Sequence, residues 1–216
     1  MTALRYRRRY VGYSWRAAAL LALLCAQSAL AGVVTVNVTT LSGVTPEDTI
    51  IVFDPLDGMP PATRGTATID QINKRFVPRV SVVRTGTAIT FPNSDHIRHQ
   101  VYSFSPAKAF TLKLYAGSPK TAVMFDHPGL VVLGCNIHDN MVAFVGVVDS
   151  PYFAKATNSG IASVSLPAGR YLLRAWHPNA VAAVPPQQIA VSAAPLSIPV
   201  RLDVDNASAA VAEWPE

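Results

Sequence analysis

Cysteine is scarce in this chain of 216 residues, which carries only Cys25 and Cys135. Beyond its first 31 residues the chain also lacks any run of about 18 apolar residues, so we expect no stable membrane insertion. No later segment keeps a 3.6-residue apolar period. Short alternating runs separated by Gly, Pro and Asn occur instead, and they predict an all-β chain with few helices.

Several catalytic signatures are missing as well. There is no Gly-rich phosphate loop, no nucleophilic serine elbow and no second Cys and His cluster for a multi-metal centre. Asp95 and Asp139 could pass for a glycosidase carboxylate pair, but both lie in predicted turns without a third group to orient a base. Turn formation is the better interpretation of both residues.

The N-terminus has the features of an export signal. Residues 1–31 begin with a basic segment, continue with the apolar stretch 17–24 and end in the small-x-small sequence at 29–31. This order predicts a secretory signal peptide, with a periplasmic or secreted mature protein starting at Gly32. Cys25 is a weak candidate for a lipid anchor because bulky Leu24 precedes it.

Charge is balanced once that segment is set aside. Five of the 18 Lys and Arg residues lie in residues 1–31, whereas all 13 Asp and Glu residues lie beyond it. The mature chain is therefore formally neutral. Nucleic-acid binding, which needs a concentrated positive surface, has no compositional support.

One short segment concentrates metal-binding side chains. Cys135, His138 and Met141 follow each other at intervals of three, between the apolar runs 130–133 and 142–148. We expect a tight loop between two buried strands, where a thiolate, an imidazole and a thioether converge. Soft sulfur ligands combined with imidazole favour copper.

A second imidazole would complete such a site, because blue-copper centres hold the metal by two His and one Cys with a weak axial Met. His99 is the candidate. It lies in a polar turn that follows the predicted strand ending at Phe91, and His96 is close enough to compete with it.

These residues carry a resemblance to a known family. Phe91 and Asn93 precede His99, Pro128 and Gly129 lead to Cys135, and the Cys-x-x-His-x-x-Met spacing follows. Residues 76–149 thereby resemble the plastocyanin and amicyanin branch of the cupredoxins. The chain departs from it at Gln100, where plastocyanins carry Asn, and beside His138, where amicyanin carries Pro.

The resemblance implies a Greek-key β-sandwich holding one type 1 copper ion. It favours His99 over His96 by the interval from Phe91, and it implies the ligand set His99, Cys135, His138 and Met141. It also implies that the ring edge of His138 reaches the surface and passes the electron, with His99 and Cys135 more buried.

The lone cysteine of the mature chain supports a metal site. Cys135 has no partner for an internal disulfide, and a free thiol in an oxidising compartment risks oxidation. A small buried hydrophobe is the alternative interpretation. The neighbouring His138 and Met141 favour the metal.

The order of segments suggests two β modules. We expect a signal peptide at 1–31, N-terminal strands at 32–66, a cupredoxin domain at 67–150, a β module at 151–205 and a flexible tail at 206–216. The pattern from Gly160 to Tyr171 resembles transthyretin-like or carboxypeptidase-regulatory sandwiches. The copper domain is then either inserted into a sandwich built from both chain ends or followed by a C-terminal appendage.

Within the copper domain we expect one strand over residues 76–83 and a hairpin turn at 84–87. Pro78 would place that strand at the edge of a sheet or put a bulge in it. His127 is expected in a solvated turn. His177 ends a strand and is expected to be structural rather than functional.

The predicted function is single-electron transfer by a periplasmic blue copper protein. Four protein ligands leave no open position for a substrate, so we expect no enzyme activity. Transient redox proteins are the expected partners. An exported copper carrier, a sandwich interaction module and zinc occupancy remain open alternatives.

Overall fold

Every regular element that the structure describes is a β-strand. The computed structural model describes residues 31–41, 46–205 and 211–215, and the predicted signal peptide lies outside them except for Ala31. The prediction of an all-β chain is confirmed. None of the described residues forms a helix that could span a bilayer.

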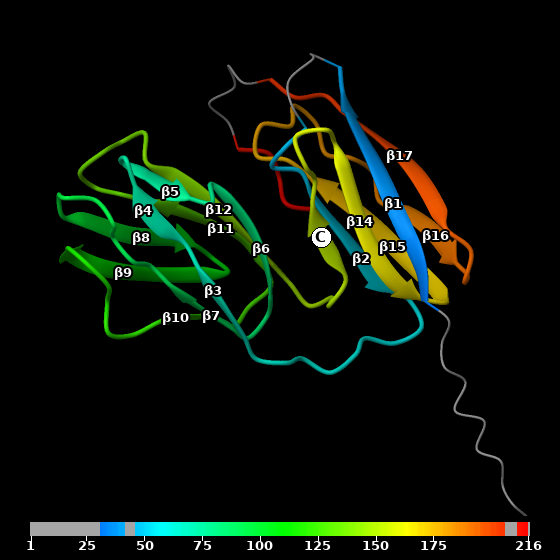
Figure 1. Cartoon of the computed structure of the whole chain (residues 1–216), viewed down its shortest axis with the longest axis horizontal. Coiled ribbons are helices and arrows are strands. Elements are labelled where there is room, and N and C mark those ends of the chain that lie inside the picture. Colours follow the sequence, from blue (N-terminus) through cyan, green and yellow to red (C-terminus); the bar gives the residue numbers. More distant parts are fainter. Residues whose placement is uncertain (1–30, 42–45, 206–210, 216) are drawn as a thin grey trace, which may run out of the picture.

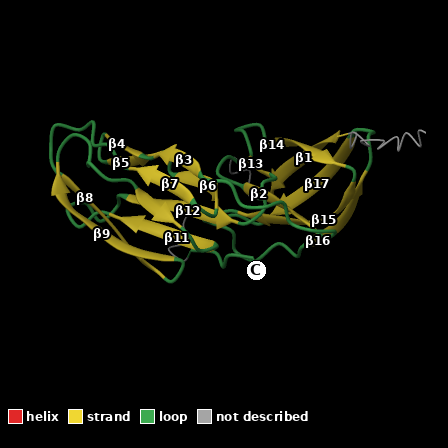
Figure 2. Cartoon of the chain, turned by 90° about the horizontal axis from the view of Figure 1, so that it is seen from below, coloured by secondary structure: helices red, strands yellow, loops and turns green. Residues whose placement is uncertain are grey.

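The strands form two modules that lie side by side (Figures 1 and 2). The central module, residues 65–150, contains ten strands, which are β3 (Gly65–Thr68), β4 (Asp70–Ile72), β5 (Arg75–Val77), β6 (Val80–Arg84), β7 (Thr87–Thr90), β8 (His99–Ser105), β9 (Lys108–Tyr115), β10 (Val123–Phe125), β11 (Gly129–Gly134) and β12 (Val142–Val148). The terminal module contains the other seven, which are β1 (Ala31–Thr40), β2 (Ile50–Pro55), β13 (Phe153–Lys155), β14 (Ile161–Pro167), β15 (Gly169–Trp176), β16 (Gln187–Val191) and β17 (Leu196–Leu202).

The central module is a sandwich. A five-stranded sheet in the order β6-β12-β11-β8-β9 faces a three-stranded sheet in the order β10-β7-β3, with the β4–β5 hairpin beside it. Their inward side chains share one hydrophobic cluster, which includes Phe91, Phe125, Val131 and Cys135. The cysteine therefore belongs to the core of this module.

The terminal module joins the two ends of the chain. Strand β1 pairs antiparallel with β14 and parallel with β17, while β2 lies between β13 and β15 in the opposite sheet. Alternate residues of β1 (Val34, Val36 and Val38) are buried in the core between the sheets. The central module thus departs from this sandwich after β2 and returns to it at β13.

Two local expectations in the central module were wrong. Residues 76–83 do not form one strand, because β5 ends before Pro78 and β6 begins after it. Residues 84–87 do not close a hairpin, because β6 lies in the five-stranded sheet and β7 in the three-stranded one. Val83 and Ile89 reach the same core from opposite layers, so the turn, with Gly86 at a φ of 89°, connects the two sheets.

A third hydrophobic cluster joins the modules. Phe144 and Val80 from the central module pack with Ile50 and Trp176 from the terminal module. Arg79 adds a polar link, since its guanidinium lies 3.0 Å from Asp48. This continuous contact holds the two sandwiches together.

The C-terminal segment contributes to that cluster, contrary to the expected flexible tail at 206–216. The ring of Trp214 lies 5.4 Å from that of Trp176, whose Nε1 donates to the carbonyl of Ala212. Trp214 also packs so closely on Gly146 that a Cβ there would lie 2.3 Å from its ring. Apolar burial therefore orders residues 211–215, while 206–210 and 216 lie outside the described residues.

Replacing Trp214 tests this contact. We expect Trp214→Ala to lower the free energy of unfolding by about 1–3 kcal/mol, because it removes a large half-buried ring from the module interface. Val211→Ala, which shortens an exposed side chain of the same segment, is the control. Equal denaturant midpoints for the two variants would show that the segment contributes no packing energy.

Candidate metal centre

Neighbouring strands bring the predicted ligand segments together. His99 is the first residue of β8, Cys135 follows the last residue of β11, and His138 lies in the loop between β11 and β12. Strands β8 and β11 are antiparallel neighbours, paired at Tyr102 and Gly134. The start of one strand and the end of the other therefore meet at the same end of the sandwich.

Three of the predicted ligands converge there. One ligand atom from each of His99, Cys135 and His138 lies within 4.8 Å of the others. The Sγ atom of Cys135 is 3.8 Å from Nδ1 of His99, and the two imidazole rings are 5.1 Å apart. His99 is 0% and Cys135 3% exposed, whereas His138 is half-buried and flanked by exposed residues.

These separations suit a metal in a trigonal plane. Bonds of about 2.0 Å to nitrogen and 2.3 Å to sulfur, as zinc makes in proteins, place the two donor atoms about 3.7 Å apart at 120°. The 3.8 Å between Sγ and Nδ1 is close to that value. Thiolate and imidazole donors fit copper or zinc and do not fit magnesium or calcium, which prefer oxygen.

A second observation favours a metal here. Nδ1 of His138 is buried and has no hydrogen-bond partner, and it is one of two such side-chain atoms within the described residues. Buried polar atoms are rarely left unpaired, since desolvation without a partner costs about 1–3 kcal/mol. A metal between His138 and Cys135 would satisfy that nitrogen.

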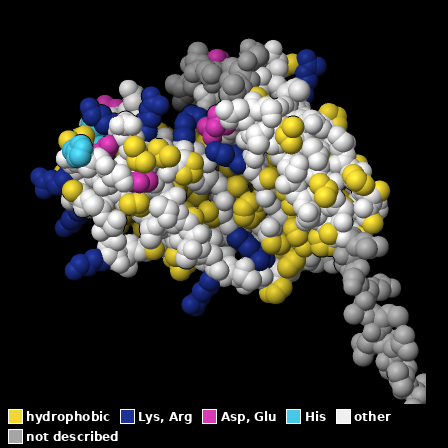
Figure 3. Space-filling view, viewed as in Figure 1, with side chains coloured by type: hydrophobic (Ala, Val, Ile, Leu, Met, Phe, Trp, Pro, Cys, Tyr) yellow, Lys and Arg dark blue, Asp and Glu magenta, His cyan; other side chains and the backbone are white. Residues whose placement is uncertain are grey.

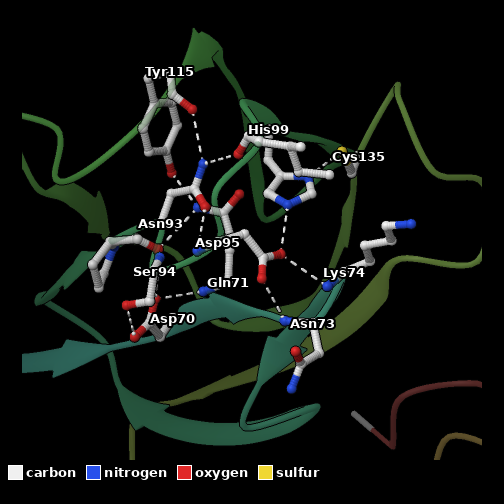
Figure 4. Close-up of polar contacts among 12 residues, drawn as sticks. Asp70, Gln71, Asn73, Lys74, Asn93, Ser94, Asp95, His99, Tyr115 and Cys135 are labelled. Atoms are coloured by element: carbon white, nitrogen blue, oxygen red, sulfur yellow. Dashed lines mark hydrogen bonds and ion pairs between the residues drawn. The ribbon is translucent and has the colours of Figure 1, made fainter.

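Asp95 orients His99, a role that sequence reasoning missed. Its Oδ2 lies 2.8 Å from Nε2 of His99 (Figure 4). A carboxylate on Nε2 keeps the proton there and leaves the Nδ1 lone pair, on the side of Cys135, free to bind a metal, as is common for metal-binding histidines. The interpretation of Asp95 as a turn residue alone was therefore incomplete, and its position four residues before His99 was the available signal.

Backbone groups hold Asp95 in place. The N–H of Asn73 donates to its Oδ1 at 2.6 Å, and the N–H of Lys74 donates to its Oδ2 at 2.8 Å. Both donors belong to the β4–β5 turn, where φ is 53° and 59°. Burial raises the pKa of Asp95, but the hydrogen bonds from Lys74, His99 and Asn73 outweigh it, so its pKa lies below the usual value.

Asn93 ties this loop to its neighbours. Its Nδ2 donates to the carbonyls of Ile97 and Tyr115, both at 2.9 Å, and its Oδ1 accepts the N–H of Asp95 at 3.0 Å (Figure 4). Its own N–H donates to the carbonyl of Gly117 at 2.7 Å. These hydrogen bonds hold the 93–99 loop in place without using a candidate ligand side chain.

Gly134 allows the two strands to meet closely beside the cysteine. A Cβ atom at this position would lie 2.7 Å from the ring of Tyr102 on β8. The tyrosine ring therefore covers the backbone directly before Cys135, and a larger residue would push it away.

The remaining candidate residues differ in their placement. Met141 is 1% exposed, shares the core cluster of Cys135, and donates its N–H to the carbonyl of His138 at 2.9 Å. His96 and His127 are exposed. His177 is buried at the module interface and its Nδ1 accepts the N–H of Asn179; burial lowers the pKa of this ring.

Comparisons with known proteins found likeness at the level of structure. No protein-family model matches the sequence, and a search of curated proteins found no match. A purple cupredoxin from Nitrosopumilus maritimus is 20% identical, with a TM-score of 0.34, over 38% of this chain and 98% of its own. Pseudoazurin from Methylobacterium extorquens AM1 is 24% identical, with a TM-score of 0.33, over 39% of this chain and 76% of its own.

A copper-containing nitrite reductase from Thermus scotoductus is also similar. It is 23% identical, with a TM-score of 0.35, over 38% of this chain, but the matched part spans only 22% of the reductase. All three likenesses leave more than half of this chain unmatched.

Replacing Asp95 tests its role at His99. We expect Asp95→Asn to weaken copper affinity about 10-fold or more, because the amide cannot supply the charged acceptor that polarises the imidazole. Competition with a chromophoric chelator measures the affinity. The control is Asp139→Asn, which removes an exposed carboxylate next to His138, and equal affinities for both variants would contradict the assignment.

Proposed function

We propose that the chain is a blue copper protein that carries single electrons between redox partners in an exported compartment. The observation that supports this most is the convergence of a buried thiol, a buried imidazole and a second imidazole with an unpaired Nδ1. His99, Cys135 and His138 would hold the ion in one plane. Met141, buried next to this loop, would be the axial ligand.

The chain's own groups suit this task. A copper ion held by these donors supplies a one-electron couple. Asp95 and Asn93 fix the direction of His99, and the core around Cys135 excludes water. Donor atoms fixed in advance by packed strands need little rearrangement when the charge of the site changes by one.

The position of His138 suits electron exchange. It is the most exposed of the three converging residues and lies on the loop that ends the sandwich. A partner that docks on this loop would approach the site without unfolding it. Four protein ligands would leave no position for a substrate, which favours electron transfer over catalysis.

Copper loading of the mature protein tests the proposal. We expect Cu(II) to produce an intense thiolate-to-copper charge-transfer band and a reversible one-electron potential. Both should be lost in Cys135→Ala, and Ser103→Ala, which alters another buried polar side chain of the module, should keep them. A colourless product with tight Cu(I) affinity would indicate a carrier, and a preference for zinc would contradict the redox role.

A further inference from the structure

The formal neutrality of the mature chain conceals an asymmetry between its modules. Residues 65–150 contain eight Lys and Arg against five Asp and Glu, whereas residues 32–64 and 151–216 together contain five against eight. The central module is therefore formally +3 and the remainder −3. The two modules, which lie side by side (Figure 1), therefore differ in the sign of their formal charge.

Most acidic groups of the central module are already engaged. Asp70 accepts the hydroxyl of Ser94 at 2.8 Å, Asp126 pairs with Lys108 at 2.9 Å, and Asp149 accepts the hydroxyl of Thr85 at 2.6 Å. Asp95 is held against His99. Asp139 is the remaining carboxylate, and it is exposed beside His138.

The basic groups around the candidate site are exposed instead. In the part of the chain that the structure describes, five of them have no ion-pair partner, and they come from four segments: Lys74, Arg75, Arg98, Lys113 and Lys120. Figure 3 shows Lys and Arg side chains gathering over this end of the molecule, near β4, β5, β8 and β9. We call these five residues the basic rim.

Fold contacts place the rim at the metal end. Lys74 lies on the turn whose N–H groups bind Asp95, and Arg98 precedes His99 directly. Arg75 lines a cavity together with Asn140, two residues after His138. Lys113 lies near the end of β9, where Tyr115 pairs with His99, and Lys120 lies in the loop whose Gly117 carbonyl binds Asn93.

Two exposed apolar side chains lie next to the candidate ligands in the chain. Ile137, which precedes His138, is 49% exposed, and Ile97, two residues before His99, is 42% exposed. An apolar centre with a polar margin is the usual arrangement of a protein–protein interface.

We propose that this end of the molecule docks on an acidic surface of a redox protein, with Ile97 and Ile137 in contact and the basic rim around them. The inference rests on the proposed function and adds the chemistry of its partner. The five cations of the rim outnumber the carboxylates of Asp70, Asp95 and Asp139 at this end, which gives it a net positive charge and a positive potential, whereas the terminal module has a net negative charge. A redox protein fits better than a membrane because the apolar contact is small and lies over the candidate ligand loop.

The first test needs no copper. Amide signals of the metal-free protein are recorded by NMR with hexacyanochromate(III), a small paramagnetic trianion, at about 20 mM salt, where the Debye length is on the order of 20 Å. We expect broadening to concentrate on residues 73–75, 97–100 and 136–140. Uniform broadening, or broadening centred on the terminal module, would overturn the proposal.

A matched pair of double variants controls for net charge. Lys74→Gln with Arg98→Gln removes two charges from the rim, while Arg64→Gln with Arg201→Gln removes two exposed charges elsewhere. Only the first pair should weaken the broadening, by on the order of 3-fold or more. Equal effects would show that net charge, not the rim, attracts the anion.

A second test uses the copper-loaded protein. Electron exchange with hexacyanoferrate, an anion, should slow by on the order of 5-fold between about 20 and 200 mM salt, and exchange with a tripositive cobalt complex should not. A blue, reversible protein without this difference would overturn the docking proposal and leave the proposed function intact. Broadening at the basic rim in a protein that forms no blue site would overturn the proposed function and leave the anion-binding surface intact.

A third experiment distinguishes an acidic protein from an anionic membrane as the partner. The metal-free protein is mixed with polyglutamate and with vesicles containing anionic phospholipid at about 150 mM salt. Binding to polyglutamate through the rim supports an acidic protein partner. Stronger binding to the vesicles through the same rim would overturn it in favour of a membrane surface.

Discussion

The contact between Asp95 and His99 is the constraint on which the candidate site depends. The carboxylate lies 2.8 Å from Nε2 of His99 and is itself held by two backbone N–H groups of the β4–β5 turn. A buried imidazole can present either nitrogen, and this contact decides that Nδ1 faces Cys135. Without it, the ring of His99 would have no fixed direction.

The rest of the central module supports that contact. The pairing of β8 with β11 places Cys135 next to His99, and close packing of Tyr102 on Gly134 keeps the two strands together. Asn93 links the loop that carries Asp95 to the end of β9. The terminal module lies beyond β6 and β12, on the other side of the shared cluster that contains Phe144 and Trp176. The site therefore lies at the free end of the molecule.

Local patterns in the sequence predicted the strands well, because alternating burial leaves a period of two that can be counted. Strands β11 and β12 lie close to the apolar runs 130–133 and 142–148 that predicted them, and the residue types of Cys135 and His138 indicated the metal loop. Long-range partners were harder to predict. The polar residues of the β4–β5 hairpin have no apolar alternation, so neither that hairpin nor its contact with Asp95 was expected.

The C-terminal segment was missed for a similar reason. Its alanines resemble a solvated tail, and only the position of Gly146 across the module interface makes room for Trp214. The turn at 84–87 was also misjudged, because the segments on both sides alternate between apolar and polar residues as strands do, but they belong to different sheets. The sheet that a strand joins depends on its contacts with residues far away in the sequence, and the pattern of a single segment does not show these contacts.

X-ray absorption at the copper edge of the loaded protein tests the central claim most directly. Our account predicts one sulfur at a short distance and two imidazole nitrogens around a single copper ion, with the short sulfur distance lost in Cys135→Ala and one imidazole lost in His99→Ala. A first shell of nitrogen and oxygen alone, unchanged in both variants, would contradict it.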